Sequence, residues 1–187
     1  MSEELLIAKI GHGFDHLDAD GDGQLTAHDH ILMGRSVALS LGYPERSEAE
    51  QRIVAAYLSI WHDLHLAQLP AGTTAITRTQ FIESTRTLAD DPAAARASLG
   101  ALAEAFLAIA DTDGSGTVDA DEFFLFQRGH FPGLDRQDAD EAFRRLDRDG
   151  DGSLSAAEFT DGIIEYWSGR DPQAPGNWWA GRPPFPG

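Results

Sequence analysis

The chain has 187 residues, 42% of them hydrophobic, which suits one large core or two small ones and excludes a disordered polymer. Its 31 acidic and 14 basic side chains give a formal charge of −17, which would repel nucleic acid and anionic lipid surfaces. Cysteine is absent, which excludes disulfides and thiolate zinc sites. Cations or basic partners are therefore the expected ligands.

The N-terminal segment predicts the compartment. Its first ten residues lack both the basic region and the long apolar region of a secretory signal peptide, and no segment reads as transmembrane. We therefore expect a soluble, cytoplasmic monomer that neither binds nucleic acid nor inserts into a membrane.

Apolar residues recur at helical spacing between clusters of turn residues. The first such stripe consists of Leu6, Ile10, Phe14 and Leu17. Helix-start signals occur at Ser47 to Glu50, Thr77 to Gln80, Ser155 to Glu158, and Asp91 followed by Pro92. The pattern predicts an all-α protein of about eight helices.

An acidic, glycine-rich repeat starts at Asp18, Asp111 and Asp147. Calcium takes six to eight oxygen ligands, and a twelve-residue EF-hand loop supplies them from positions 1, 3, 5, 7, 9 and 12, with glycine at position 6. All three repeats fit this pattern, and each lies between helical stripes. The sequence therefore predicts three calcium-binding EF-hand loops.

The first loop runs from Asp18 to Asp29 and ends in aspartate rather than glutamate. Its predicted ligands are the carboxylates of Asp18, Asp20, Asp22 and Asp29, the backbone carbonyl of Gln24, and a water held by Thr26. Because aspartate is one methylene shorter, bidentate contact at position 12 requires the loop to contract, or one oxygen is lost. We expect this site to bind calcium more weakly and to tolerate magnesium.

A second helix-loop-helix unit is expected within residues 43–90, as a partner for the first. Its best alignment places Ile76 at position 8, the residue that pairs neighbouring loops. The ligand positions would then fall on Leu69, Ala71, Thr73 and Gln80, which include no carboxylate. We expect this unit to keep the EF-hand shape but not to bind a metal ion.

The third and fourth loops are complete. The third is predicted to bind through Asp111, Asp113, Ser115, the Thr117 carbonyl and Glu122, with Asp119 acting through water. The fourth is predicted to bind through Asp147, Asp149, Asp151, the Ser153 carbonyl and Glu158, with a water held by Ser155. Val118 and Leu154 occupy position 8 and should pair the two loops.

These units divide the chain into three parts. Residues 1–90 form an N-terminal EF-hand pair, residues 91–169 a C-terminal pair, and residues 170–187 a tail that contains Trp178 and Trp179. Five of the nine prolines lie in this tail, which precludes a helix there. We expect the tail to pack its tryptophans on the lobes, and we leave open whether residues 183–187 are mobile.

Three intact loops, a degenerate second hand and the ending Asp171 to Trp178 resemble the calerythrin and sarcoplasmic calcium-binding protein family. The resemblance covers nearly the whole chain. It implies two EF-hand pairs in a compact cytosolic calcium buffer or signal modulator. Asp29 departs from the family pattern, and residues 179–187 lie outside it.

Our leading hypothesis is a calcium buffer or transporter whose binding also completes folding, because each loop brings four carboxylates together. The alternative is a sensor that regulates a target protein. Sensors use Met-rich surfaces, whereas this chain has only Met1 and Met33. We do not expect this protein to be an enzyme, because the sequence shows no combination of a nucleophile, a base and a group that orients the base.

Seven histidines are present, among them His12 and His16 at one-turn helical spacing. No acidic residue beside them completes a zinc-protease signature, so a surface or packing role is expected. Relatives that bind luciferin-type ligands in an aromatic cavity suggest another use of the four Trp and ten Phe. We rank that use below core packing.

Overall fold

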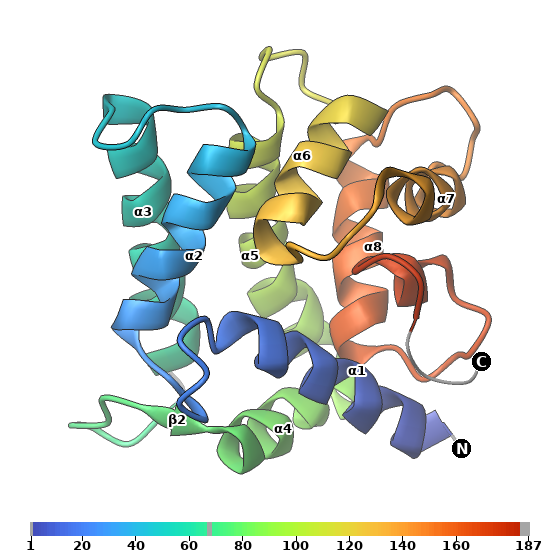
Figure 1. Ribbon diagram of the computed structural model, residues 1–187. Coiled ribbons are helices and arrows are strands. Elements are labelled where there is room, and N and C mark those ends of the chain that lie inside the picture. The colour runs from blue at the N-terminus through green and yellow to red at the C-terminus, as the bar shows by residue number, and fades with distance from the viewer. Residues whose placement is uncertain (1, 67–68, 184–187) are drawn as a thin grey trace.

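Eight α-helices form most of the part of the chain that the computed structural model describes, residues 2–66 and 69–183 (Figure 1). Their bounds are α1 Ser2–Leu17, α2 Ala27–Ser40, α3 Glu48–Ile60, α4 Arg78–Arg86, α5 Pro92–Ala110, α6 Ala120–His130, α7 Arg136–Leu146 and α8 Ala156–Ser168. Short π or 3-10 segments are η1 Trp61–His65, η3 Thr87–Asp90 and η4 Pro175–Trp178. The predicted all-α class and helix count are confirmed.

Consecutive helices form four helix-loop-helix units that associate in two pairs. In the N-terminal pair, α2 packs against α3 and α1 against α4, while in the C-terminal pair α5 packs against α8 and α6 against α7 (Figure 1). The predicted start signals operate: Thr77 and Ser155 each form a complete capping box, and the Asp91 side chain accepts from the amides of Ala93 and Ala94.

Short strand contacts join the loops within each pair. Strands β1 Gln24–Leu25 and β2 Ile76–Thr77 pair antiparallel, with Leu25 opposite Ile76. In the C-terminal pair, Val118 and Leu154 exchange backbone hydrogen bonds of 3.0 and 2.7 Å. Both pairings were predicted, so the alignment of the degenerate second hand on Ile76 is confirmed.

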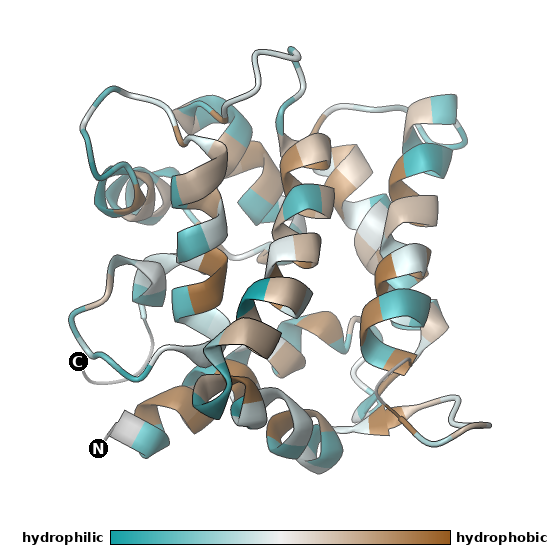
Figure 2. Cartoon of the chain, turned by 180° about the vertical axis from the view of Figure 1, so that it is seen from behind, coloured by the Kyte–Doolittle hydropathy of each residue, from teal (hydrophilic) through white to brown (hydrophobic). Residues whose placement is uncertain are grey.

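The buried apolar side chains form two clusters that do not follow the order of the chain. The smaller contains Leu6, Ile10, Phe14, Leu25, Trp61, Ile76 and Phe81. The larger joins residues of α2 and α3, such as Val37 and Tyr57, to the core of the C-terminal pair. Figure 2 shows the apolar side of several helices turned toward the interior. The second and third helices therefore share their core with the last four.

Helices α2 and α6 meet at a close seam between the two pairs. An added Cβ at Gly129 would lie only 2.6 Å from the Cα of Val37, so glycine permits this approach. The hydroxyls of Ser36 and Ser40 donate to backbone carbonyls of Gly129 and Leu125 at 2.7 and 2.6 Å. Each of these two helices begins at the end of an acidic loop, so the seam connects loops one and three.

Helix α5 is long and apolar enough to cross a membrane by length and composition, which the sequence analysis did not recognise. In the fold it packs against α8 and places Ala95, Leu99 and Phe106 in the larger core. Core helices pass the same test, so this helix is weak evidence for a membrane span.

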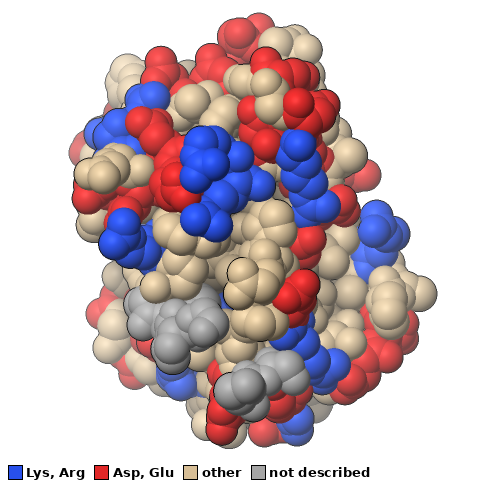
Figure 3. All heavy atoms as spheres, turned by 90° about the vertical axis from the view of Figure 1, so that its right-hand side faces the viewer, with Lys and Arg blue, Asp and Glu red and all other residues tan. Residues whose placement is uncertain are grey.

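The tail folds back on the C-terminal pair. The Trp179 side chain is 3% exposed, its ring lies 4.9 Å from that of Phe159, and its carbonyl accepts from Gln127. Figure 3 shows the face of α7, α8 and the tail, where basic and acidic side chains border an area without charged side chains. There the Arg145 guanidinium lies 4.2 Å from the Trp178 ring. The question left open for residues 183–187 concerns mainly residues 184–187, which lie outside the described part.

Lys9 of α1 holds the tail from the other side. Its side chain is fully buried, and its Nζ donates to the carbonyls of Glu165 and Gly169 and to Oδ1 of Asn177, at 2.7, 2.7 and 2.9 Å. Burial lowers the pKa of Lys9 to about 8. Three acceptors match the three protons of the ammonium group, so Lys9 is held in its charged form at neutral pH.

Candidate metal sites and an interior cavity

Three clusters of carboxylates lie in the described part of the chain, one in each predicted loop. They are Asp18, Asp20 and Asp22; Asp111, Asp113 and Glu122; and Asp147, Asp149 and Glu158. Within each cluster, one oxygen from every side chain lies within 4.8 Å of the others. Hard carboxylate oxygens at this spacing fit calcium or magnesium and do not favour softer metals.

Glycine at position 6 makes the turn that gathers these carboxylates. The φ angles of Gly23, Gly116 and Gly152 are 85°, 86° and 88°, a left-handed conformation that glycine adopts without strain. The amide of each glycine donates to the first aspartate of its loop, at 2.8, 2.9 and 3.0 Å. The backbone thus orients the position-1 carboxylate before any cation binds.

The position-12 glutamates are oriented in the same way. Glu122 accepts from the amides of Thr112 and Asp113 with one oxygen and from the Asp119 amide with the other. Burial raises the pKa of Glu158, but hydrogen bonds from Ser155, Arg148 and Asp149 outweigh it and leave the pKa lowered. These glutamates are the third residue of α6 and α8, so the helix start fixes the final ligand.

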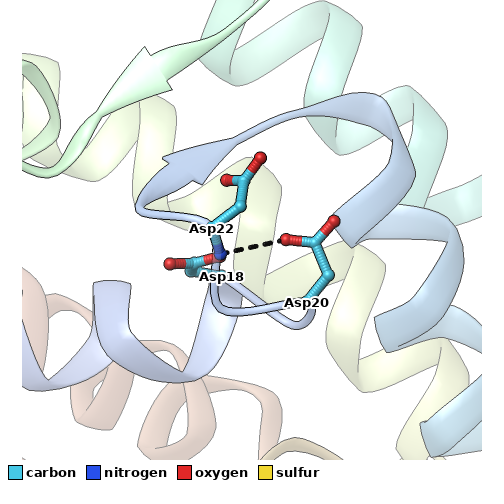
Figure 4. Close-up of side chains that lie close together, drawn as sticks. All are labelled: Asp18, Asp20 and Asp22. Carbon is cyan, nitrogen blue, oxygen red and sulfur yellow. Dashed lines mark hydrogen bonds between the residues drawn. The ribbon is translucent and has the colours of Figure 1, made fainter.

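Asp29 is arranged differently. It is 1% exposed and accepts from the amides of Ala19 and Asp20 and from the Thr26 amide and hydroxyl. The Asp29 side chain is shorter than that of Glu122 but accepts from the amides at the same loop positions. The first loop is therefore more contracted than the third. Even so, among the described residues the first cluster contains Asp18, Asp20 and Asp22 and not Asp29 (Figure 4).

The remaining predicted ligands stand beside these clusters. In the third loop the Ser115 hydroxyl donates to the Thr117 carbonyl at 3.1 Å, so two predicted ligand groups face each other. In the fourth loop Asp151 accepts from the Ser153 amide and hydroxyl, both at 2.9 Å. Coordination of a metal ion by any of the predicted ligands stays a prediction.

The sequence favoured core packing over a ligand cavity for the aromatic residues. The structure nevertheless contains a cavity of about 540 Å³ between the helix pairs. Its walls are mainly apolar and come from both pairs and the tail, and include Met33, Ile60, Leu99, Phe106, Trp167 and Trp179. Four histidines and Tyr57 also reach it: His16, His30, His65 and His130. A cavity of this size can hold a small organic molecule.

The polar groups of the cavity differ in how they are satisfied. Nδ1 of His130 donates to the Phe126 carbonyl at 3.1 Å, so its Nε2 accepts from the Tyr57 hydroxyl at 2.5 Å. Burial lowers the pKa of His130 to about 4 and that of His65 to about 3, so both rings are neutral at pH 7. In the sequence, the only sign of this cavity was the number of histidines at apolar helical positions. That sign alone does not distinguish histidines that pack in a core from histidines that bind a ligand.

Four helix-loop-helix units, three of them with acidic loops, make up the architecture of an EF-hand protein. A family model described as an EF-hand domain pair matches residues 101–164, which include the third and fourth loops. Over these residues the chain matches EF-hand proteins, and its acidic clusters have the hard oxygen ligands that calcium takes.

Three known proteins resemble the chain over most of its length. The chain is 26% identical to calerythrin of Saccharopolyspora erythraea over 172 residues, 91% of this chain and 96% of that protein. The structure of a Streptomyces coelicolor calcium-binding protein matches with TM-score 0.66 and 26% identity over 86% of this chain and 96% of that one. That structure is described as showing the basis for prokaryotic calcium-mediated regulation. The resemblance to the calerythrin family is confirmed.

The third relative shares the fold. The calcium-loaded apo form of a coelenterazine-binding protein from Renilla muelleri matches with TM-score 0.79 over 96% of this chain and 97% of that one. Sequence identity is 21%, so the match extends to architecture alone.

Proposed function

We propose that this protein is a cytoplasmic calcium buffer or transporter that binds three calcium ions per monomer, with binding coupled to folding. The observation that carries the proposal is the position of Trp179. Its ring packs against Phe123 and Phe159, which belong to the helices that follow loops three and four. The apolar surface that a sensor would offer to a target is therefore covered by the chain's own tail.

In this proposal each loop places four carboxylates around one cation, and in loop three one of them, Asp119, acts through water. A bound calcium ion would neutralise their mutual repulsion, and this free energy would favour the folded state. Loops three and four act as the stronger pair, because Glu122 and Glu158 lie within their clusters. Loop one acts as the weaker, magnesium-tolerant site, because Asp29 does not.

Titration calorimetry with and without millimolar magnesium tests the proposal, together with a dye that reports newly exposed apolar surface. A buffer binds three calcium ions, loses the weakest event in magnesium, and shows little dye response. A strong calcium-dependent dye signal would favour the alternative, a sensor that regulates a target protein. Regulation is what the Streptomyces relative is described as performing.

The cavity supports a second candidate function, a calcium-dependent carrier of a small apolar ligand. Its volume and its mixture of aromatic walls and buried histidines suit an aromatic molecule. The relative from Renilla, with the same fold, is described as binding coelenterazine. Saturable quenching of the tryptophan fluorescence by an apolar aromatic probe, abolished by the cavity-narrowing change Ser98→Phe, would support this function. Quenching that does not saturate would contradict it.

A further inference from the structure

The outer face of α2 carries two leucines that neither core uses. Leu32 and Leu39 belong to neither buried cluster, nor to the partly buried side chains packed against those clusters. Leu39 is 67% exposed, more than any other large apolar side chain of the described residues. Seven positions separate the two leucines, so they lie on one side of the helix, two turns apart. This side of α2 is therefore apolar and has no partner within the described chain.

Both leucines line a surface groove of about 470 Å³, which we call the α2 groove. One wall is the outer face of α2, and the other is formed by Tyr43 and Arg46 in the connection to α3. Helices α2 and α3 run side by side, and residues 41–47 join them (Figure 1). The α2 groove shares no lining residue with the interior cavity, so it is a separate feature of the described surface.

Arg46 stands in the α2 groove with an unusual backbone conformation. Its φ angle of 62° is the only positive value at a non-glycine residue in the described part of the chain. The carboxylate of Glu50 accepts from the Arg46 amide, and the Gln51 side chain donates to the Arg46 carbonyl at 3.1 Å. Contacts on both sides of the residue thus hold a conformation that side chains rarely adopt. Strain of this kind concentrates at binding sites.

The exposed charges of the α2 groove are opposite in sign to the net charge of the chain. Glu50 is 9% exposed, and its carboxylate is engaged by the Arg46 amide and, at 3.7 Å, by the Arg35 guanidinium. The Arg46 guanidinium pairs with no carboxylate of the described residues. Arg35 and Arg46 therefore outnumber Glu45, the remaining acid of the groove, in a chain of formal charge −17. Positive charge beside exposed leucines complements a partner that is both apolar and acidic.

We propose that the α2 groove docks an acidic amphipathic helix of a partner protein. Apolar side chains of that helix cover Leu32 and Leu39, and its carboxylates pair with Arg35 and Arg46. A helix suits the groove because the two leucines lie two turns apart, so equally spaced side chains of a second helix can meet both. The inference goes beyond calcium binding and does not depend on it. Docking would bring the acidic loops of this protein to its partner.

A matched pair of designed helical peptides tests the α2 groove. Both carry leucines at alternating three- and four-residue spacing, and one is flanked by glutamates where the other has lysines. In saturating calcium, the acidic peptide should bind the wild type and shift the backbone amide NMR signals of residues 32–50. Net charge alone predicts the reverse, because a chain of charge −17 repels an acidic peptide. No binding of the acidic peptide, or shifts confined to other residues, would overturn the proposal.

Leu39→Gln tests the apolar contact. It should weaken binding of the acidic peptide at least about tenfold, because a leucine buried by the peptide is lost. The control Ile7→Gln changes the other exposed large apolar side chain, on α1, and should leave the affinity as in the wild type. Both positions are exposed, so both variants should fold. Equal affinities of Leu39→Gln and the wild type would contradict docking in the α2 groove.

Arg46→Gly tests the charge and separates it from the fold. Glycine adopts a positive φ without strain, so thermal stability should stay close to that of the wild type. Affinity for the acidic peptide should fall roughly twofold to fivefold, as expected for one exposed ion pair. Arg52→Gln, at an exposed position of α3 outside the groove, should keep the affinity. Unchanged affinity in Arg46→Gly would exclude its guanidinium from the contact.

A second copy of the chain is the other occupant that sedimentation can detect. Docking of a partner helix predicts that the wild type stays monomeric as its concentration rises, since two chains of charge −17 repel each other. Association that grows with concentration and disappears in Leu39→Gln would assign the α2 groove to a dimer. That result would overturn the proposal of an acidic partner.

Discussion

Leu25 and Ile76 lie directly opposite each other, and they join a loop rich in carboxylates to a loop that has none. Both side chains are buried in the smaller core. The shape of the first loop is thus supported by a partner that needs no cation. In the C-terminal pair, by contrast, Val118 and Leu154 join two acidic loops, so each depends on charge neutralisation in the other.

Replacing Ile76 should therefore affect one site only. Ile76→Ala should cost roughly 2–5 kcal/mol of unfolding free energy, typical for a buried isoleucine, and weaken calcium binding at loop one. Urea unfolding and calorimetry measure the two effects. Binding at loops three and four should stay as in the wild type, and a loss at all three sites would contradict the separate support of loop one.

Glu122→Gln and Glu158→Gln should each remove one strong calcium site. Each change deletes a charged ligand oxygen and preserves side-chain size, so we expect a loss of at least about 100-fold in affinity at that loop. In the variant that carries both changes, calorimetry should detect two fewer strong calcium-binding events than in the wild type. Glu104→Gln, the same change at an exposed site outside the loops, serves as the control. A wild-type count of four would mean that residues 69–80 bind a cation after all.

Asp29→Glu should tighten calcium binding at loop one and reduce its tolerance of magnesium. The longer side chain can reach the cluster of Asp18, Asp20 and Asp22, as Glu122 reaches its own cluster. Calcium titration in the presence and absence of magnesium measures both effects. Unchanged or weaker calcium binding would show that the contracted loop already suits aspartate.

Trp179→Ala should destabilise the protein by roughly 3–5 kcal/mol, because its ring is buried among aromatic side chains. It should also raise the binding of a hydrophobic dye. The neighbouring change Trp178→Ala removes the contact with Arg145, expected to contribute about 0.5–1 kcal/mol, and only part of a core contact, so it should cost less. Thermal unfolding compares the two. Equal effects, or no dye response after deletion of residues 170–187, would mean that the tail covers no apolar surface.

Acid should destabilise the fold through its buried histidines. The pKa of His130 is lowered to about 4 by burial, against about 6.5 in an unfolded chain, so below pH 6.5 the unfolded state binds more protons. Stability from this residue is complete above pH 6.5 and is lost as pH falls toward 4. Between pH 6.5 and 5 the loss should be roughly 1.5 kcal/mol. In urea unfolding with saturating calcium, His130→Gln should show a shallower pH slope, and an equal slope would exclude His130 as a source.

The spacing of the acidic loops was enough to predict most of the fold. Ligand positions, glycine turns and position-8 apolar residues are local features of one twelve-residue pattern, so the pairing of Val118 with Leu154 followed from sequence. Ile76 could be placed because its flanking residues keep the loop shape although their carboxylates are gone.

Contacts between distant parts of the chain could not be predicted in this way. The cavity depends on how far the two helix pairs stand apart, and no local pattern encodes that distance. Gly129 and Val37 lie in separate helices whose close approach is visible only when both are placed.

Lys9 gives the order of synthesis a role in folding. Its partner Asn177 lies 168 residues later in the chain, so at about 5–20 residues per second the ribosome makes it roughly 10–30 seconds after Lys9. During that interval the lysine ammonium has no buried acceptors from the tail and must stay in water. Helix α1 therefore reaches its final place only after Glu165, Gly169 and Asn177 have emerged from the ribosome.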